Sequence, residues 1–258
     1  MVPVWFMEAD SHLLHLACVS FNSGSYKEGA IDVKLAGKFL IVVFMFSLTG
    51  CLWWNGPSGP GTPEALYMRG QEAYQEGDYK DAVGIFQRLT EEYPLSKYAI
   101  PAELGVADSY FSNDDYISAE ANYSDFMEFH PTSENLPYVM CQIGVCHYRQ
   151  MLEIDRDQTE THLAEKSFEK LISRFPSSKF SFLAEKKLTE CKKRLGEHEF
   201  YVGQFYFNIG QYSAALGRFK IVEEKYAHLG INYKTAYFIH ETEKRLAEEE
   251  KKKIEKTD

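Results

Sequence analysis

The chain has 258 residues, of which 45% are hydrophobic and 15% aromatic, and a formal net charge of −10 at neutral pH. This length allows one large domain or two small ones, and the apolar content supports a sizeable core, which excludes global disorder. The negative charge is spread along the chain and argues against a general binder of nucleic-acid backbones. Five cysteines in a chain of this length do not make a disulfide framework.

An uncharged run, FLIVVFMFSL (residues 39–48), follows Lys34 and Lys38. As a helix it measures ~15 Å, about half of the ~30 Å hydrocarbon core of a membrane, so it is too short to span one. A short apolar run behind a basic flank is typical of a signal peptide. Residues 1–32 fit such a leader poorly because they carry Glu8, Asp10, Glu28 and Asp32 against the single basic residue Lys27. We therefore expect translation to begin near Val33, with residues 1–32 as a mis-assigned upstream extension.

The apolar run ends in Leu48-Thr49-Gly50-Cys51, which resembles a bacterial lipobox. In that motif the small residues let the signal peptidase approach the backbone, and the thiol accepts diacylglycerol. The Gly/Pro-rich tract that follows cannot continue a helix and is typical of a tether, whereas a cysteine ending a short core helix would leave this tract unexplained. The expected segments are a lipoprotein signal peptide over residues 33–50 and a lipidated flexible tether over residues 51–63.

A pattern of small and aromatic residues then occurs four times. Gly70 and Ala107 are each followed twelve residues later by an alanine, and four residues after that by a large aromatic. The third unit carries an insertion between its halves, and the fourth has Ala227 where the first three end in proline. This is the tetratricopeptide pattern, in which small residues lie where antiparallel helices cross and aromatics fill the gap between pairs. The small positions are Gly70, Ala107, Val145 and Gly203, and the aromatic positions are Phe86, Tyr123, Phe168 and Phe219.

The sequence thus predicts an all-α fold, a tetratricopeptide-repeat superhelix of about ten helices in five antiparallel pairs, with a concave face. A helical segment over 178–195 continues into a helix that begins near Glu197, and residues 231–253 form the last helix. Cys141 and Cys146 lie about 140° apart on a helix, at ~100° per residue, so we expect small buried core residues rather than a disulfide or metal site. The expected domains are N-terminal repeats over 64–176, C-terminal helical repeats over 177–253, and a disordered tail over 254–258.

The lipobox, the tether and the repeats together resemble the BamD family, the ComL-type lipoproteins of the outer-membrane β-barrel assembly machine. The insertion of the third unit reads Ile154-Asp155-Arg156-Asp157-Gln158-Thr159, and this Arg-Asp-Gln-Thr loop is similar to that family and foreign to the generic repeat. The stretch over 201–206 is similar as well. The resemblance covers about residues 48–226 and departs at the C-terminal end, where the last helix has no proline-closed partner.

The resemblance implies a non-enzymatic scaffold that binds the periplasmic domains of the barrel-forming assembly component, other assembly lipoproteins and unfolded outer-membrane proteins, and no nucleic acid. It implies no cofactor apart from the covalent diacylglycerol and acyl chain on Cys51, which anchor the protein at ~0.8 kcal/mol per buried methylene. In Gram-negative lipoproteins an aspartate after the cysteine signals inner-membrane retention. Leu52 stands there in this chain, which implies the periplasmic face of the outer membrane.

The family's client groove lies in the first repeats, and the residues next to the small positions of first helices are expected to face the concave side. Aromatic rings with a few polar groups suit extended peptide segments through stacking and backbone hydrogen bonds. The alternative, that rings such as Tyr74 and Phe111 only cover neighbouring helices, has equal weight. The client-groove candidates are Tyr67, Gln71, Tyr74, Leu104, Asp108, Phe111, Gln142 and Arg149.

The resemblance also implies a docking surface on the C-terminal half, where Lys187, Lys193 and Arg194 form a basic group in an acidic protein. A guanidinium can bind a carboxylate of a partner through two hydrogen bonds, and the family uses a basic residue of this helix in that way. Arg194 is therefore the main docking candidate. A solvated charged face is the alternative.

Two other classes of protein remain as alternatives. An enzyme is disfavoured because the mature chain has no nucleophile elbow, phosphate loop or metal motif, and its histidines lack ligand spacing. The nearer alternative is another periplasmic repeat lipoprotein that organises cell-envelope or cell-division complexes. The periplasmic cell-division coordinator has a coiled coil before its repeats and no lipid anchor, whereas here the tether leads to Glu64 without heptads.

Overall fold

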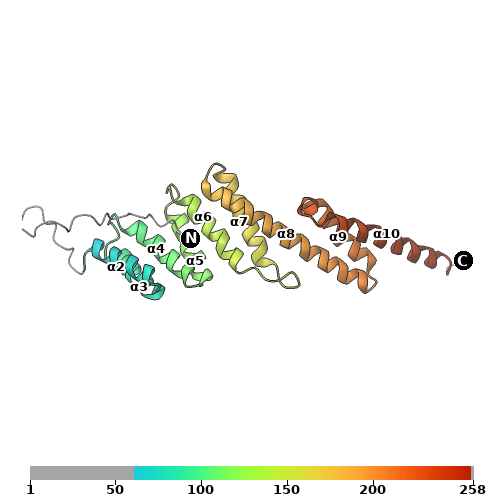
Figure 1. The fold of residues 1–258 in the computed structure, drawn as a ribbon, viewed down its shortest axis with the longest axis horizontal. Coiled ribbons are helices and arrows are strands. Elements are labelled where there is room, and N and C mark those ends of the chain that lie inside the picture. The colour runs from blue at the N-terminus through green and yellow to red at the C-terminus, as the bar shows by residue number, and fades with distance from the viewer. Residues whose placement is uncertain (1–60, 257–258) are drawn as a thin grey trace, which may run out of the picture. The chain divides into compact units, whose positions relative to one another are not determined.

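The computed structural model describes residues 61–256, which lie within one compact unit, Pro57–Asp258. These residues form nine α-helices and one 3-10 turn, and no strand occurs among them (Figure 1). The predictions for the upstream extension, the signal peptide, the lipobox and Cys51 lie outside the described residues. The helices are α2 (Pro63–Glu76), α3 (Tyr79–Glu92), α4 (Ala99–Ser112), α5 (Tyr116–Phe129), α6 (Leu136–Arg149), α7 (Thr159–Arg174), α8 (Lys179–Asn208), α9 (Tyr212–Tyr226) and α10 (Asn232–Ile254), with the 3-10 turn η1 (Ala227–Leu229).

Each helix packs against the next one along the chain, and the first helices of neighbouring pairs also touch, α2 against α4 and α6 against α8. Because every helix covers both its pair partner and the following pair, no helix buries its apolar side alone. This stacking, together with the repeated turns and core positions described next, confirms the predicted all-α tetratricopeptide-repeat fold.

The turns inside three of the pairs share one backbone geometry. Gly77, Asp114 and Gly210 have φ values of 86°, 60° and 79°, in the left-handed region. The amide of the next residue donates in each case to a carbonyl five residues earlier, for example Asp78 N to Ala73 O at 2.9 Å. This is the hydrogen bond that ends a helix with a left-handed residue, and it reverses the chain within two residues. The two helices of these pairs are therefore connected by the same tight turn.

The second helices of the first three pairs also end alike. Tyr93, His130 and Phe175 leave the helical region, each with its amide still bonded to the carbonyl four residues back. Each precedes a proline, which disfavours helical backbone at the residue before it. The fourth pair has Ala227 at the corresponding place, and the chain continues there through η1 to Gly230.

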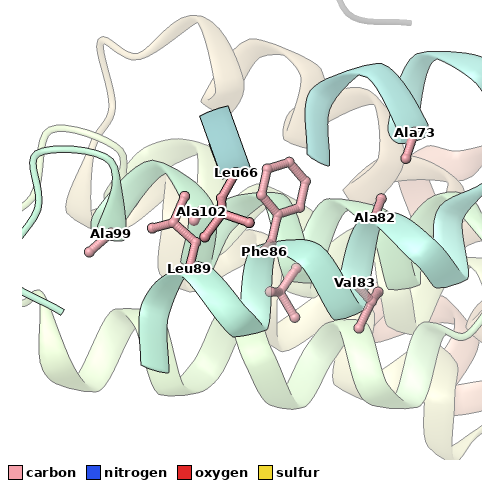
Figure 2. Close-up of a cluster of buried hydrophobic side chains, with 9 residues drawn as sticks. Leu66, Ala73, Ala82, Val83, Phe86, Leu89, Ala99 and Ala102 are labelled. Carbon is pink, nitrogen blue, oxygen red and sulfur yellow. The ribbon is translucent and has the colours of Figure 1, made fainter. Parts of the chain in front are cut away.

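The four aromatic positions are buried, and Phe86 shows why their neighbours must be small. Its ring lies between α2 and α4, where a Cβ added to Gly70 or Gly105 would come within 2.6 or 2.7 Å of a ring carbon. Figure 2 shows Phe86 gathered with Leu66 and Leu89 in the core of the first pair. The predicted alanine four residues before each ring is fully buried in every pair: Ala82, Ala119, Ala164 and Ala215.

The third pair differs from the sequence prediction by one residue. The ring of Phe168 lies against Gly144, where an added Cβ would come within 2.5 Å of it, so the close approach is at Gly144 and not at Val145. Val145 is a buried core residue beside it. The insertion before α7 hides this register in the sequence, since a glycine and a valine in succession both fit the small position.

The helical segment over 178–195 continues, as expected, into the helix that begins near Glu197, and the two form the single 30-residue helix α8. Gly196 lies within it, and a Cβ there would come within 2.9 Å of Tyr226 and Ile231, so the connection between α9 and α10 packs closely on the middle of α8. The described residues therefore hold nine α-helices where the sequence suggested about ten.

Cys141, Cys146 and Cys191 are free and buried, as expected for core residues. Burial raises the pKa of the Cys141 thiol to about 11 and those of Cys146 and Cys191 to about 12, which keeps all three protonated at neutral pH. Among residues 61–256, no helix is both long enough and apolar enough to cross a membrane.

Candidate functional site

Side chains from α2, α4 and α6 form a continuous polar and aromatic surface, which we call the first-helix face. It contains seven of the eight residues predicted for the client groove. On α2, Tyr67 accepts a 2.8 Å hydrogen bond from Gln71 and stacks on Tyr98, with ring centroids 5.3 Å apart. The members are Tyr67, Gln71, Tyr74, Leu104, Asp108, Phe111 and Gln142, all of them partly buried.

Tyr74 joins α2 to α4 on this face, because its hydroxyl lies 2.8 Å from Ser112 Oγ. Its ring also meets Tyr79 edge-on at 5.5 Å, and Phe111 meets Tyr116 in the same way at 5.4 Å. Both rings therefore cover the start of the second helix in their own pair, which is the packing role given above as the alternative to client binding. They are still partly exposed, so one ring serves packing and surface together.

Asp108 links three helices. Its Oδ1 accepts hydrogen bonds from the hydroxyls of Tyr123 on α5 and Tyr138 on α6, both at 2.5 Å. Gln142 Nε2 lies 3.4 Å from the Tyr123 hydroxyl and 3.5 Å from that of Tyr138. The ring of Tyr138 continues the surface to Phe180 on α8, with centroids 5.5 Å apart.

The electrostatics of the first-helix face are those of a partly desolvated carboxylate among phenols. Burial raises the pKa of Asp108, and the two tyrosine donors only partly oppose this. Burial and then the charge of Asp108 raise the pKa of both Tyr123 and Tyr138. The same two causes raise the pKa of Tyr67 and Tyr74, against their own hydrogen bonds, so the carboxylate acts across α2 as well.

The eighth groove candidate, Arg149, is exposed at the end of α6 and makes no contact with Asp108. Once the third pair is aligned on Gly144, the residue equivalent to Tyr74 and Phe111 is Tyr148. Its hydroxyl donates to Glu190 on α8, and Lys187 Nζ lies 4.0 Å from its ring centroid. The hydrogen bond to Glu190 and burial raise the pKa of Tyr148 to about 12.

The docking candidates lie on α8 beside the loop between α6 and α7. Arg194 Nη1 donates to Leu152 O at 2.6 Å and lies 3.5 Å from a carboxylate oxygen of Glu153. Lys193 is exposed, with Glu197 at 3.9 Å, and Lys187 is held over Tyr148. Arg194 thus contacts its own chain first, while 28% of its side chain stays exposed.

The α6–α7 loop is held by side chains at four of its carbonyls. Gln158, buried, donates to Glu153 O at 2.8 Å and Arg156 O at 3.1 Å. His198 Nδ1 donates to Ile154 O at 2.7 Å, and Arg194 holds Leu152 O. The Arg-Asp-Gln-Thr segment therefore has a structural role that its residues alone did not reveal: its glutamine fixes the loop from inside.

Sequence reasoning treated Tyr123 only as a packing ring and did not single out Tyr138, Gln158 or His198 as functional. A signal was present at Tyr123, since the equivalent positions of the other three pairs are phenylalanine and a buried hydroxyl requires a partner. Among the described residues, no group of three or more histidine, cysteine, aspartate or glutamate side chains could hold a metal ion.

The fold and the first-helix face define a tetratricopeptide-repeat protein whose first helices present polar and aromatic side chains together. Residues 60–257 match the model of the YfiO family, described as outer membrane lipoprotein, and the chain belongs to that family. It is 28% identical over 140 residues to the outer membrane protein assembly factor BamD of Vibrio cholerae, covering 50% of this chain and 58% of that protein. The BamD of Caulobacter vibrioides is 25% identical over 125 residues, covering 48% and 41%.

The chain thus covers about half of the length of these relatives. Among solved structures, it is similar to a thermophilic tetratricopeptide-repeat protein of Thermus thermophilus at 17% identity, covering 69% of this chain and 99% of that one, with a TM-score of 0.38. A putative kinesin light chain with nearly identical repeats from Podospora anserina is similar at 9% identity, covering 76% and 100%, with a TM-score of 0.42.

Proposed function

We propose that this protein is a non-enzymatic assembly factor for outer-membrane proteins, anchored by lipid to the periplasmic face of the outer membrane. The observation that carries the proposal is the family match over residues 60–257, joined by relatives in several organisms that are named as outer membrane protein assembly factors. The tetratricopeptide-repeat fold supports it, because stacked helix pairs build an extended surface for binding other polypeptides.

The first-helix face is the proposed contact for unfolded outer-membrane proteins. Such clients present extended segments whose side chains alternate in direction and whose backbone groups lack partners. Tyr67, Tyr74 and Phe111 offer ring surface for apolar side chains, while Gln71 and Gln142 offer amide groups to a free backbone. Because these side chains are held by contacts within the protein, little conformational freedom is lost when a client binds.

The α8 surface is the proposed contact for the barrel-forming assembly component. Lys193 and the free N–H groups of Arg194 face solvent beside the α6–α7 loop, and a carboxylate of the partner can accept from them. Other assembly lipoproteins are further proposed partners. The anchor is the lipid on Cys51 with its lipobox Leu48, Thr49 and Gly50, and the protein needs no other cofactor.

The experiment that tests the function is recovery of the lipidated protein from native membranes in mild detergent, followed by mass spectrometry of what accompanies it. A barrel-forming assembly component is expected among the recovered proteins. Its absence would refute the proposal, and recovery of cell-division or other envelope proteins in its place would favour the alternative role as an organiser of those complexes. Cys51→Ser should abolish labelling with a palmitate analogue, and labelling that persists would remove the anchor assignment.

The docking surface is tested in the same recovery. Arg194→Glu should reduce the yield of the barrel-forming component, because it reverses the charge that faces the partner. His198→Ala is the matched control, since it removes a hydrogen bond to the same loop and leaves the guanidinium in place. An equal loss in both variants would mean that loop geometry carries the docking, and an unchanged yield for Arg194→Glu would remove Arg194 from the interface.

A further inference from the structure

Asp108 has one oxygen in use and one without a donor. The hydroxyls of Tyr123 and Tyr138 both donate to Oδ1. Within residues 61–256 no hydrogen bond or ion pair reaches Oδ2, although the carboxylate is partly buried. A carboxylate can accept about four hydrogen bonds, and a desolvated one without a counter-charge is costly. Half of this group is therefore free to bind something that is not part of the described chain.

The surroundings of this oxygen select the chemistry of what can bind. Tyr67 and Tyr74 lie close enough for the charge of Asp108 to act on their hydroxyls, and Tyr138 stands edge-on to Tyr123 with ring centroids 6.3 Å apart. No lysine or arginine of the described chain contributes to the electrostatics of Asp108. A carboxylate among tyrosine side chains, with no cation beside it, is an environment that suits an organic cation, through charge and through cation–π contact with a ring.

We propose that Asp108 and the surrounding tyrosines form a specificity site for a basic side chain, arginine foremost, carried by an unfolded client segment on the first-helix face. The site rests on the proposed function, because it gives the client contact a chemical preference. An arginine can donate N–H groups to Oδ2 while its plane lies on a tyrosine ring, which a lysine ammonium cannot do with the same geometry. The tyrosine donors on Oδ1 hold the carboxylate in place for this contact.

A metal ion fits the site less well than a basic side chain. Calcium takes six to eight oxygen ligands and magnesium an octahedral set of oxygens, whereas here a single carboxylate stands among phenols that already donate to it. An acidic client segment is repelled both by Asp108 and by the net charge of −10. The site therefore favours segments in which a basic residue lies among apolar and aromatic ones.

The test compares two peptides that differ only in charge. Both are short, fluorescent and built of alternating threonine and tyrosine, with either arginine or its neutral isostere citrulline at the centre. Binding to the full-length lipidated protein in detergent is measured by fluorescence anisotropy at low ionic strength. We expect the arginine peptide to bind about tenfold more tightly than the citrulline peptide, the size of one charged hydrogen bond. Salt should reduce this preference.

Asp108→Asn is the informative variant, because it keeps the shape and removes the charge. The variant should bind the arginine and citrulline peptides about equally, with its affinity for the citrulline peptide the same as that of the wild type. Asp125→Asn is the matched control, since it makes the same change of net charge at an exposed position of α5 and should keep the preference. A wild-type protein that binds both peptides equally, or an Asp108→Asn variant that still prefers arginine, would overturn the site.

One further measurement covers the case in which the variant cannot be used. If Asp108→Asn fails to fold, the carboxyl ¹³C resonance of Asp108 in the wild-type protein is followed instead. A saturable shift with the arginine peptide and none with the citrulline peptide supports the site, and identical responses overturn it. Equal binding of both peptides leaves the proposed client function standing, whereas binding of neither contradicts that function and the site together.

Discussion

The first and second helix pairs place an aromatic ring at the same position and surround it in opposite ways. In the first pair Phe86 lies in an apolar slot between two glycines. In the second pair Tyr123 occupies the equivalent place, is equally buried, and sends its hydroxyl to a carboxylate shared with Tyr138. The repeat thus fixes where the ring lies, while one added oxygen decides whether the neighbouring surface is polar. Core packing and the polarity of the surface are set by different atoms of the same position.

The largest expected effect comes from emptying the apolar slot. Phe86→Ala should lower the free energy of unfolding by about 3–5 kcal/mol, because it removes the ring and leaves a cavity between α2, α3 and α4. Urea denaturation followed by circular dichroism measures this. A loss below about 1 kcal/mol would mean that the slot collapses or is not the core of the first pair.

The next effect tests the width of the slot. Gly105→Ala should destabilise by about 1–3 kcal/mol, since the new methyl group would lie 2.7 Å from the Phe86 ring. Gly84→Ala is the matched control, because Gly84 is exposed on α3 with nothing near its Cβ position, and a helical alanine there should stabilise by up to about 1 kcal/mol. Effects of the same sign in both variants would contradict the close approach.

The third pair sharpens the comparison, because its buried polar contacts lie in a loop. Gln158→Leu should cost about 1–3 kcal/mol, since it leaves the carbonyls of Glu153 and Arg156 without their donor. Hydrogen exchange of residues 151–157 should speed up, while exchange in α2 and α3 stays unchanged. Gln75→Leu, at an exposed position of α2, provides the control and should leave both readouts as they are.

The hydroxyl of Tyr123 should contribute less than the phenylalanine ring of the first pair. Tyr123→Phe is expected to lower the free energy of unfolding by about 0.5–1.5 kcal/mol, since Asp108 keeps the donor on Tyr138. The urea midpoint reports the change. A loss as large as that of Phe86→Ala would mean that the polar contact, and not the ring, carries the packing of the second pair.

The smallest effect is the pH dependence of Asp108. Its pKa is raised in the folded protein by burial, so protonation favours folding, and its contribution to stability is lost as the pH rises through the folded value. The stability of the wild type relative to Asp108→Asn should therefore be highest below about pH 3.9, fall across the interval above it, and become constant at higher pH. A difference independent of pH would show that the carboxylate is solvated.

Much of the fold follows from spacing alone, because a helix with an alanine four residues before an aromatic presents both on one side. The register of the third pair could not be read in this way, since Gly144 and Val145 are both small enough and only the position of the Phe168 ring distinguishes them. Only part of the polar contact could be predicted from the sequence. Tyr123 stands out because the equivalent residues of the other pairs are phenylalanine, but the sequence does not show that its hydroxyl donates to Asp108, which depends on how α4 packs on α5. Arg194 was singled out for its charge, yet its nearest acceptor is a backbone carbonyl, which no residue pattern reveals.

The length of helix α8 affects how a force would pass between the last helices and the α6–α7 loop. At ~1.5 Å per residue its 30 residues make a rod of about 45 Å without a turn or a proline in it. The middle of α8 carries Arg194 and His198 against the α6–α7 loop, and nearer its C-terminal end Gly203 receives the ring of Phe219 from α9. Helix α8 packs against α7 of the third pair on one side and forms the fourth pair with α9 on the other. Because the same unbroken helix contacts the third pair and belongs to the fourth, a force applied to the last helices reaches the α6–α7 loop as a rigid tilt of α8.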